Sequence, residues 1–140
     1  MIRTATPEDI PALVGMIERL HASAGVVLPI DRAVTTRFLR MLHASPIGWL
    51  RVWDTGAGPT GFLAASIGTA SISMLPVAAE HGWWADGGGG LRLLRAYLAW
   101  AKSQGCFAAR MSTPPHNERA AAILSRSGFE LAEQAWVKVL

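Results

Sequence analysis

The chain has 140 residues, the length of one domain and too short for two ordinary ones. Its hydrophobic fraction of 51% and charged fraction of 16% exclude a disordered chain, because enough apolar surface is present to form a core. The net charge is only +3, and the 13 basic residues are dispersed without a basic run, which argues against a nucleic-acid-binding protein. The single cysteine excludes an internal disulfide framework and fits a reducing compartment.

No secretory signal or membrane span is expected. Residues 1–4 lack an apolar core, and the acids Glu8 and Asp9 follow closely. The segment 55–79 carries no charge and is long enough for a transmembrane helix, but glycines, prolines and hydroxyl side chains interrupt it. Two buried strands with a polar connection explain this segment better than one helix does. We therefore expect a soluble, cytoplasmic protein that binds no membrane.

Apolar residues recur at helical spacing in some segments and alternate or run together in others, with glycine and proline between them. In chain order the expected elements are strand 2–5, helix 7–21, helix 32–45, strand 49–54, strand 62–69, strand 75–84, helix 90–104, strand 106–111, helix 117–127 and strand 129–139. This order, β-α-α-β-β-β-α-β-α-β, predicts an α/β (α+β) fold. We expect a single domain over residues 1–140, with a mixed central β-sheet flanked by about four helices.

The most informative junction holds four successive glycines, Gly87, Gly88, Gly89 and Gly90, between an expected strand and an expected helix. Glycines let the backbone approach a ligand closely and turn several N–H groups toward one point. The N-terminus of the following helix adds its dipole and unpaired donors, so the junction favours an anion such as pyrophosphate. A plain tight turn is the alternative that four glycines alone leave open.

Two familiar nucleotide-binding loops are excluded by spacing. A P-loop requires Gly-Lys-Ser/Thr at the start of the helix, whereas Gly90 is followed by Leu91 and Arg92. A Rossmann loop belongs in the first βα unit, with an acid about 20 residues further on, and neither condition holds.

The segment Ala85-Asp86-Gly87-Gly88-Gly89-Gly90 resembles the Arg/Gln-x-x-Gly-x-Gly/Ala signature of the GNAT superfamily of acyl-CoA-dependent N-acyltransferases. The opening residues 2–9 are similar to that family's usual opening, and residues 117–129 are similar to its final helix and the turn after it. The resemblance therefore covers nearly the whole chain in the right order. It implies acyl transfer, most simply of acetyl, from coenzyme A to an amine.

The resemblance also implies which residues hold acetyl-CoA. The pyrophosphate would lie over residues 87–91, and the strand before the glycines would give backbone donors to the pantetheine and the thioester carbonyl. Ala85 stands where the family has Arg or Gln, so one side-chain contribution is missing, and Arg92 or Arg95 could replace it. The expected coenzyme-binding residues are Trp83, Trp84, Ala85, Gly87, Gly88, Gly89, Gly90, Leu91, Arg92 and Asn117.

Two residues are candidates for catalysis. Glu80 is the one acid on the strand that should line the cleft, where desolvation would raise its pKa and let it act as a base, directly or through water. On the opposite face of that strand it would simply point to solvent. His116 lies in the turn before the last helix, near the thioester end by resemblance, although a lone histidine there also fits a surface or capping role. Many family members protonate the leaving thiolate with a tyrosine in this helix, but Leu124 occupies that position.

Two functions remain open from the sequence. The first is an N-acetyltransferase whose acceptor, a small-molecule or peptide amine, attacks the thioester directly. The second is a non-catalytic acyl-CoA-binding module, which the departures at Ala85 and Leu124 favour. No metal is expected, because no cluster of His, Cys and acidic residues has the spacing of metal ligands. The apolar C-terminal end, residues 135–140, could leave a sheet edge for a second copy, so a homodimer is also expected.

Overall fold

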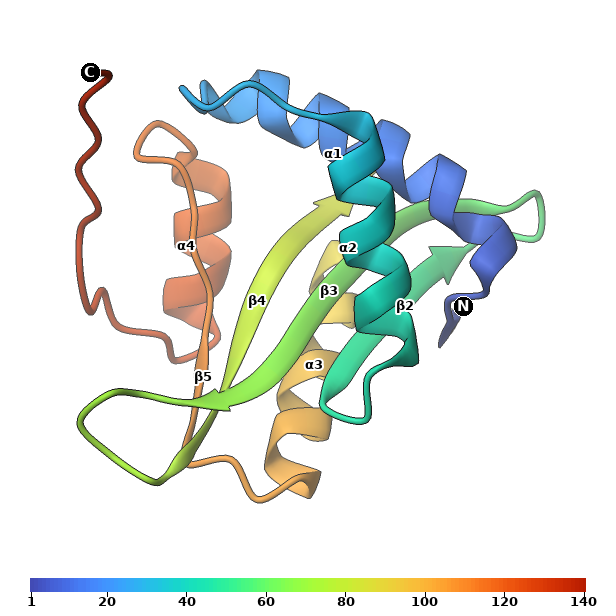
Figure 1. Cartoon of the computed structure of the whole chain (residues 1–140). Coiled ribbons are helices and arrows are strands. Elements are labelled where there is room, and N and C mark those ends of the chain that lie inside the picture. Colours follow the sequence, from blue (N-terminus) through green and yellow to red (C-terminus); the bar gives the residue numbers. More distant parts are fainter.

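A computed structural model describes all of residues 1–140 and confirms the α/β (α+β) fold with a mixed sheet (Figure 1). The elements are β1 (Ile2–Thr4), the 3-10 turn η1 (Pro7–Asp9), α1 (Ile10–Ala24), α2 (Arg32–Ala44), β2 (Gly48–Asp54), β3 (Pro59–Thr69), β4 (Pro76–Ala85), α3 (Gly90–Ser103), β5 (Ala108–Arg110) and α4 (Glu118–Arg126). None of these helices combines the length and the apolar character that crossing a membrane requires.

The strands lie in the order β1-β2-β3-β4-β5, so neighbours in the sequence are neighbours in the sheet. The first four strands are antiparallel, while β5 is parallel to β4 because α3 connects them. In the β3–β4 pair, Ala64 lies opposite Gly82 and Ala65 lies opposite Glu80, which leaves His81 as the extra residue of a β-bulge. β5 pairs with β4 only at residues 77–79, so the rest of β4 has a strand partner on one side alone.

Side chains alternate between the two faces of the sheet and form two apolar cores. In Figure 1, α1 and α2 cover the near face and α3 lies on the far face. The core beneath α1 and α2 includes Leu13, Leu39 and Phe62, all fully buried. The core on the α3 side includes Leu94 and Tyr97 and also receives a residue from α4. Burial on both faces explains why β3 reads as a nearly continuous apolar run rather than a strict alternation.

An ionic network fixes the start of the chain to the sheet. The guanidinium of Arg3 donates to Asp9 in η1 at 2.6 Å and to Asp54 at the end of β2 at 2.8 Å. Asp9 is 7% exposed and also accepts a hydrogen bond from the backbone N–H of Thr6 at 2.8 Å. The Arg3 guanidinium holds the pKa of Asp9 at about 2, below its ordinary value of 3.8.

The expected last strand, residues 129–139, is wrong. No regular element follows α4, and Figure 1 shows the red C-terminal segment running outside the sheet. Its apolar side chains are exposed, with Leu131 at 83% and Trp136 at 91%. A strand needs a hydrogen-bonded neighbour, and this segment pairs with no strand of the chain. It contacts β5 through an ion pair between the side chains of Glu133 and Arg110, which is no substitute for backbone pairing. The alternating apolar pattern of residues 129–139 therefore does not form a strand within the single chain.

Candidate functional site

The glycine loop joins β4 to α3 as predicted, with α3 beginning at Gly90. Gly87, Gly88 and Gly89 have φ values of 74°, 151° and 83°, a region that side chains with a Cβ disfavour. Gly89 is the N-cap of α3, and no side chain caps this helix end. The first-turn N–H groups are therefore free of side-chain partners, and with the positive end of the helix dipole they form a site suited to an anion.

Gly89 also has a packing role. A Cβ built on it would lie 2.3 Å from Cγ of Trp53, which is far inside van der Waals contact. The guanidinium of Arg92, on the first turn of α3, lies over the same indole at 5.1 Å from the ring centroid. Trp53 therefore packs against the backbone of the loop at Gly89 and holds Arg92 beside the helix end by a cation–π contact.

Asp86 anchors the other end of the loop. Its backbone N–H donates to the carbonyl of Thr60 at 2.8 Å, and its carboxylate accepts from the indole N–H of Trp84 at 3.0 Å. The second carboxylate oxygen accepts from the guanidinium of Arg19 on α1 at 2.7 Å. These bonds fix where the run of glycines begins, which glycines alone could not do.

Trp83 and Trp84 point to opposite faces of the sheet. The indole N–H of Trp83 donates to the carbonyl of Gly90 at 3.1 Å, and the ring packs in the core on the α3 side. The ring of Trp84 packs against the core beneath α1 and α2. Both side chains are engaged in packing, so what these residues can offer a coenzyme is the backbone of β4, whose edge toward β5 is unpaired beyond Ala79.

Glu80 lies where β4 and β5 separate. Its carboxylate accepts two hydrogen bonds from Ser112, from the backbone N–H at 3.1 Å and from the hydroxyl at 3.2 Å. Burial raises the pKa of Glu80, and the two bonds from Ser112 oppose that rise. Of the two placements left open by the sequence, the structure shows Glu80 tied to the segment after β5 rather than extended into solvent.

The bulge residue His81 is a feature that sequence reasoning left without a role. Its Nε2 is hydrogen-bonded to the hydroxyl of Ser66 at 2.7 Å, and its ring meets Phe38 of α2 edge-on at 5.3 Å between centroids. Burial lowers the pKa of His81. Glu80 and His81 lie on opposite faces of the sheet, as neighbours in a strand do. Because His81 is the bulge residue, Gly82 lies on the same face as His81. A Cβ on Gly82 would touch Phe62, which belongs to the core beneath α1 and α2.

His116 and Asn117 connect the start of α4 to its surroundings. Nε2 of His116 donates to the carbonyl of Ser23 at the end of α1, at 2.9 Å, and His116 makes no hydrogen bond to Glu80. The side-chain oxygen of Asn117 accepts from the N–H of Ala120 at 3.0 Å and so caps α4. The Asn117 amide NH₂ makes no hydrogen bond within the chain, which leaves it available to a ligand.

No tyrosine is available at α4. Leu124 is 9% exposed and packs in the core on the α3 side. The one tyrosine of the chain, Tyr97, is fully buried and donates its hydroxyl to the carbonyl of Arg110 at 3.0 Å. Burial, together with the charge of Glu80, raises the pKa of Tyr97. No three His, Cys, Asp or Glu side chains come together as a metal site would need.

Solved structures share this fold. The chain aligns with a transcriptional regulator from Bacillus halodurans with TM-score 0.80 and 19% identity, covering 100% of this chain and 99% of that one. It aligns with a predicted acetyltransferase from Clostridium acetobutylicum, solved with acetyl-CoA, with TM-score 0.79 and 15% identity, covering 100% and 95%. A third match is AAC(6')-Iy in complex with the bisubstrate analogue CoA-S-monomethyl-acetylneamine, with TM-score 0.78 and 17% identity, covering 100% and 97%.

Neither the family models nor the curated protein sequences match this chain. The structural matches extend over its full length and include acetyltransferases whose structures hold acetyl-CoA or a coenzyme A analogue. The chain therefore has the fold of the GNAT-type acetyltransferases, the superfamily that its sequence resembles.

Proposed function

We propose that this protein transfers an acetyl group from acetyl-CoA to a primary amine of a small molecule. The observation that carries the proposal is the uncapped N-terminus of α3, preceded by three glycines at positive φ at the end of a strand with an unpaired edge. Such a junction presents several N–H donors to one anionic group. Two proteins of the same fold, solved with acetyl-CoA and with a coenzyme A analogue, support acetyl-CoA as the ligand.

The residues around the loop fit a pyrophosphate. The first-turn N–H groups of α3, at Gly90, Leu91 and Arg92, have no acceptor within the helix, and no side chain caps this end. Ala85 adds no charge, while the guanidinium of Arg92 is held beside the helix end over Trp53. Backbone groups along the unpaired edge of β4 and the free amide N–H of Asn117 suit the amide-rich pantetheine arm.

Glu80 is the proposed proton acceptor, directly or through one water. The amine nitrogen forms a bond to the thioester carbonyl carbon, the C–S bond breaks, and the proton lost by the nitrogen goes to the Glu80 carboxylate. A pKa raised by burial suits this role, because it brings the carboxylate closer to the working pH. His116 is the second candidate, as a source of the proton taken up by the thiolate, which otherwise leaves unassisted since Leu124 cannot supply one.

Coenzyme A binding to the Gly90→Val variant tests the proposal. A Cβ at Gly90 would meet its nearest neighbour, Cβ of Ala85, at 3.5 Å, which is ordinary contact, so the fold should remain intact. The added side chain would nevertheless block close approach of a phosphate to the helix end. Isothermal titration should show coenzyme A binding to the parent and to the control Gly68→Val, whose Cβ enters open space, but not to Gly90→Val. Equal binding by Gly90→Val and its parent would place the coenzyme elsewhere.

A non-catalytic acyl-CoA-binding module is the second candidate function. The observation that favours it is the absence of a tyrosine near α4, since Tyr97 is engaged in the core and Leu124 is apolar. Both candidates bind coenzyme A, but only the enzyme releases its free thiol from acetyl-CoA in the presence of amines. Thiol release above the rate of spontaneous hydrolysis, measured with a panel of primary amines, decides between them.

A further inference from the structure

The carboxylate of Glu80 is held by one of its two oxygens. Both of its hydrogen bonds, from the backbone N–H and from the hydroxyl of Ser112, end on Oε2. Oε1 accepts no hydrogen bond within the chain, and no cationic side chain pairs with Glu80. Because each oxygen of an ionised carboxylate is an acceptor, Oε1 is the atom of Glu80 that is left to take a proton.

Ser112 reaches Glu80 because β4 and β5 separate at this point. The parallel pairing of the two strands ends at Ala79 and Arg110. Two residues after Arg110, the N–H of Ser112 donates to the side chain of Glu80 and not to the backbone of β4. The contact therefore lies where the unpaired edge of β4 begins, which is the edge that the proposed function assigns to the pantetheine arm.

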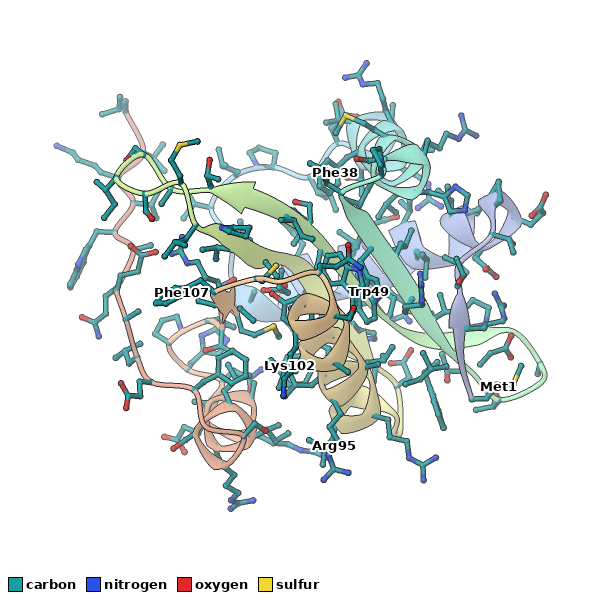
Figure 2. All side chains as sticks on the ribbon, turned by 90° about the horizontal axis from the view of Figure 1, so that it is seen from below. Met1, Phe38, Trp49, Arg95, Lys102 and Phe107 are labelled. Carbon is teal, nitrogen blue, oxygen red and sulfur yellow. The ribbon has the colours of Figure 1, made fainter.

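Glu80 lies on the sheet face that α3 covers. Its partner across the β3–β4 pair, Ala65, packs in the core on that side. In Figure 2, α3 and Phe38 of α2 lie on opposite sides of the sheet. Burial and the charge of Glu80 together raise the pKa of Tyr97 on α3, so the two groups are neighbours. Tyr97 donates its hydroxyl to the carbonyl of Arg110, however, and gives Glu80 no hydrogen bond.

The other titratable groups around Glu80 are engaged elsewhere or face away from it. On β5, Arg110 pairs with Glu133. On β4, His81 lies on the opposite face and is bonded to Ser66. β3 has no titratable side chain, and the charged residues of α3 and α4 are exposed to solvent. Ser112 is therefore the one partner that stabilises the charged form of Glu80 against burial.

We infer that Ser112 is a positioning residue for acetyl transfer: it holds Oε2 of Glu80 so that Oε1 takes the proton from the amine. The inference rests on the proposed function, in which Glu80 is the proton acceptor. As the N–H bond of the amine breaks and the proton binds Oε1, Oε2 becomes the carbonyl oxygen of the neutral acid and keeps its bonds from Ser112. These bonds are stronger to the charged carboxylate, so they also keep Glu80 ionised at a lower pH than burial alone would allow.

Two titrations of the Ser112→Ala variant test this role. The substitution removes the hydroxyl bond and keeps the backbone bond, so the pKa of Glu80 should rise. The NMR signal of the Glu80 carboxyl carbon, assigned by its loss in Glu80→Gln, should titrate at a higher pH than in the parent. In assays of thiol release with the best amine of the panel, kcat should be about three-fold or more lower below the midpoint of its pH profile, while the KM for acetyl-CoA stays the same.

Two further variants serve as controls. Ser112→Thr keeps the hydroxyl at an exposed position with room for a methyl group, and should restore both titrations. Thr113→Ala removes a neighbouring hydroxyl that is not bonded to Glu80, and should change neither.

An NMR titration of Glu80 that does not move in Ser112→Ala would overturn the inference. A pH–rate profile that stays in place while the NMR titration moves, or equal effects of Ser112→Ala and Thr113→Ala, would overturn it as well. Absence of thiol release by the parent with every amine would instead count against the proposed function. The NMR titration needs no turnover, so it would still decide whether Ser112 holds Glu80.

Discussion

Replacing Gly89 with alanine tests how the glycine loop is held in place. Gly89 has φ of 83°, where an alanine costs about 1–2 kcal/mol, and its new Cβ would lie 2.3 Å from the Trp53 ring. Trp53 cannot swing away freely, because it packs against the core on the α3 side and lies under the guanidinium of Arg92. Overpacking of this kind adds about 1–3 kcal/mol. We therefore expect Gly89→Ala to lower the free energy of unfolding by about 2–5 kcal/mol, and to weaken coenzyme A binding as the loop shifts.

Gly87→Ala is the matched comparison, because Gly87 also has positive φ, 74°, but a Cβ there meets nothing within 4 Å. It should cost only the backbone strain, about 1–2 kcal/mol. Urea unfolding of both variants measures the difference, and Gly89→Ala combined with Trp53→Ala isolates the contact as a coupling energy. Equal destabilisation by Gly87→Ala and Gly89→Ala, with no coupling to Trp53, would refute the packing explanation.

Three other predictions follow from the same structure. Glu80→Gln should lower the rate of acetyl transfer and remove the rise of rate with pH that an ionising base produces, while leaving acetyl-CoA affinity unchanged; an unaltered pH–rate profile would eliminate Glu80 as the base. Asp9 has its pKa lowered from 3.8 to about 2, so its contribution of about 2 kcal/mol is present above pH 3.8 and lost as pH falls toward 2. Asp9→Asn should therefore destabilise the protein at pH 7 and hardly at all near pH 2, as urea unfolding at both pH values would show. The exposed apolar segment 129–140 should drive dimerisation at high micromolar concentration, so light scattering should report a dimer for the full chain and a monomer after its deletion; a monomeric full chain would contradict this.

The order of elements and the junction of β4 with α3 could be predicted from the sequence, because both depend on local signals. The spacing of apolar residues marks the helices, and four consecutive glycines predict a break between regular elements, since glycine disfavours the interior of both helices and strands. The hydrogen bonds of Glu80 with Ser112 could not be predicted, because they join residues 32 positions apart after two strands have become neighbours. The bulge at His81 was equally hidden, since it appears only when β3 and β4 are in register.

The last strand shows the opposite difficulty. Residues 129–139 have the apolar alternation of a strand. Such alternation indicates only that a segment is able to pair, not that a partner lies beside it. Whether a partner lies beside the segment depends on the three-dimensional arrangement, and in the single chain the neighbouring edge is the three-residue strand β5. The pattern thus identifies which surface a second copy would use without showing that the copy is present.

The sheet order β1-β2-β3-β4-β5 also bears on how the chain folds. The two largest strand pairings, β2 with β3 and β3 with β4, join segments connected by short loops, so they close with little loss of chain entropy and can form early. β5 must wait for α3 to cross the sheet, and it contributes only three paired residues. We therefore expect the half of the candidate site built on β3 and β4 to assemble first, and the half built on β5 and α4 to close last and to open most easily in the native state.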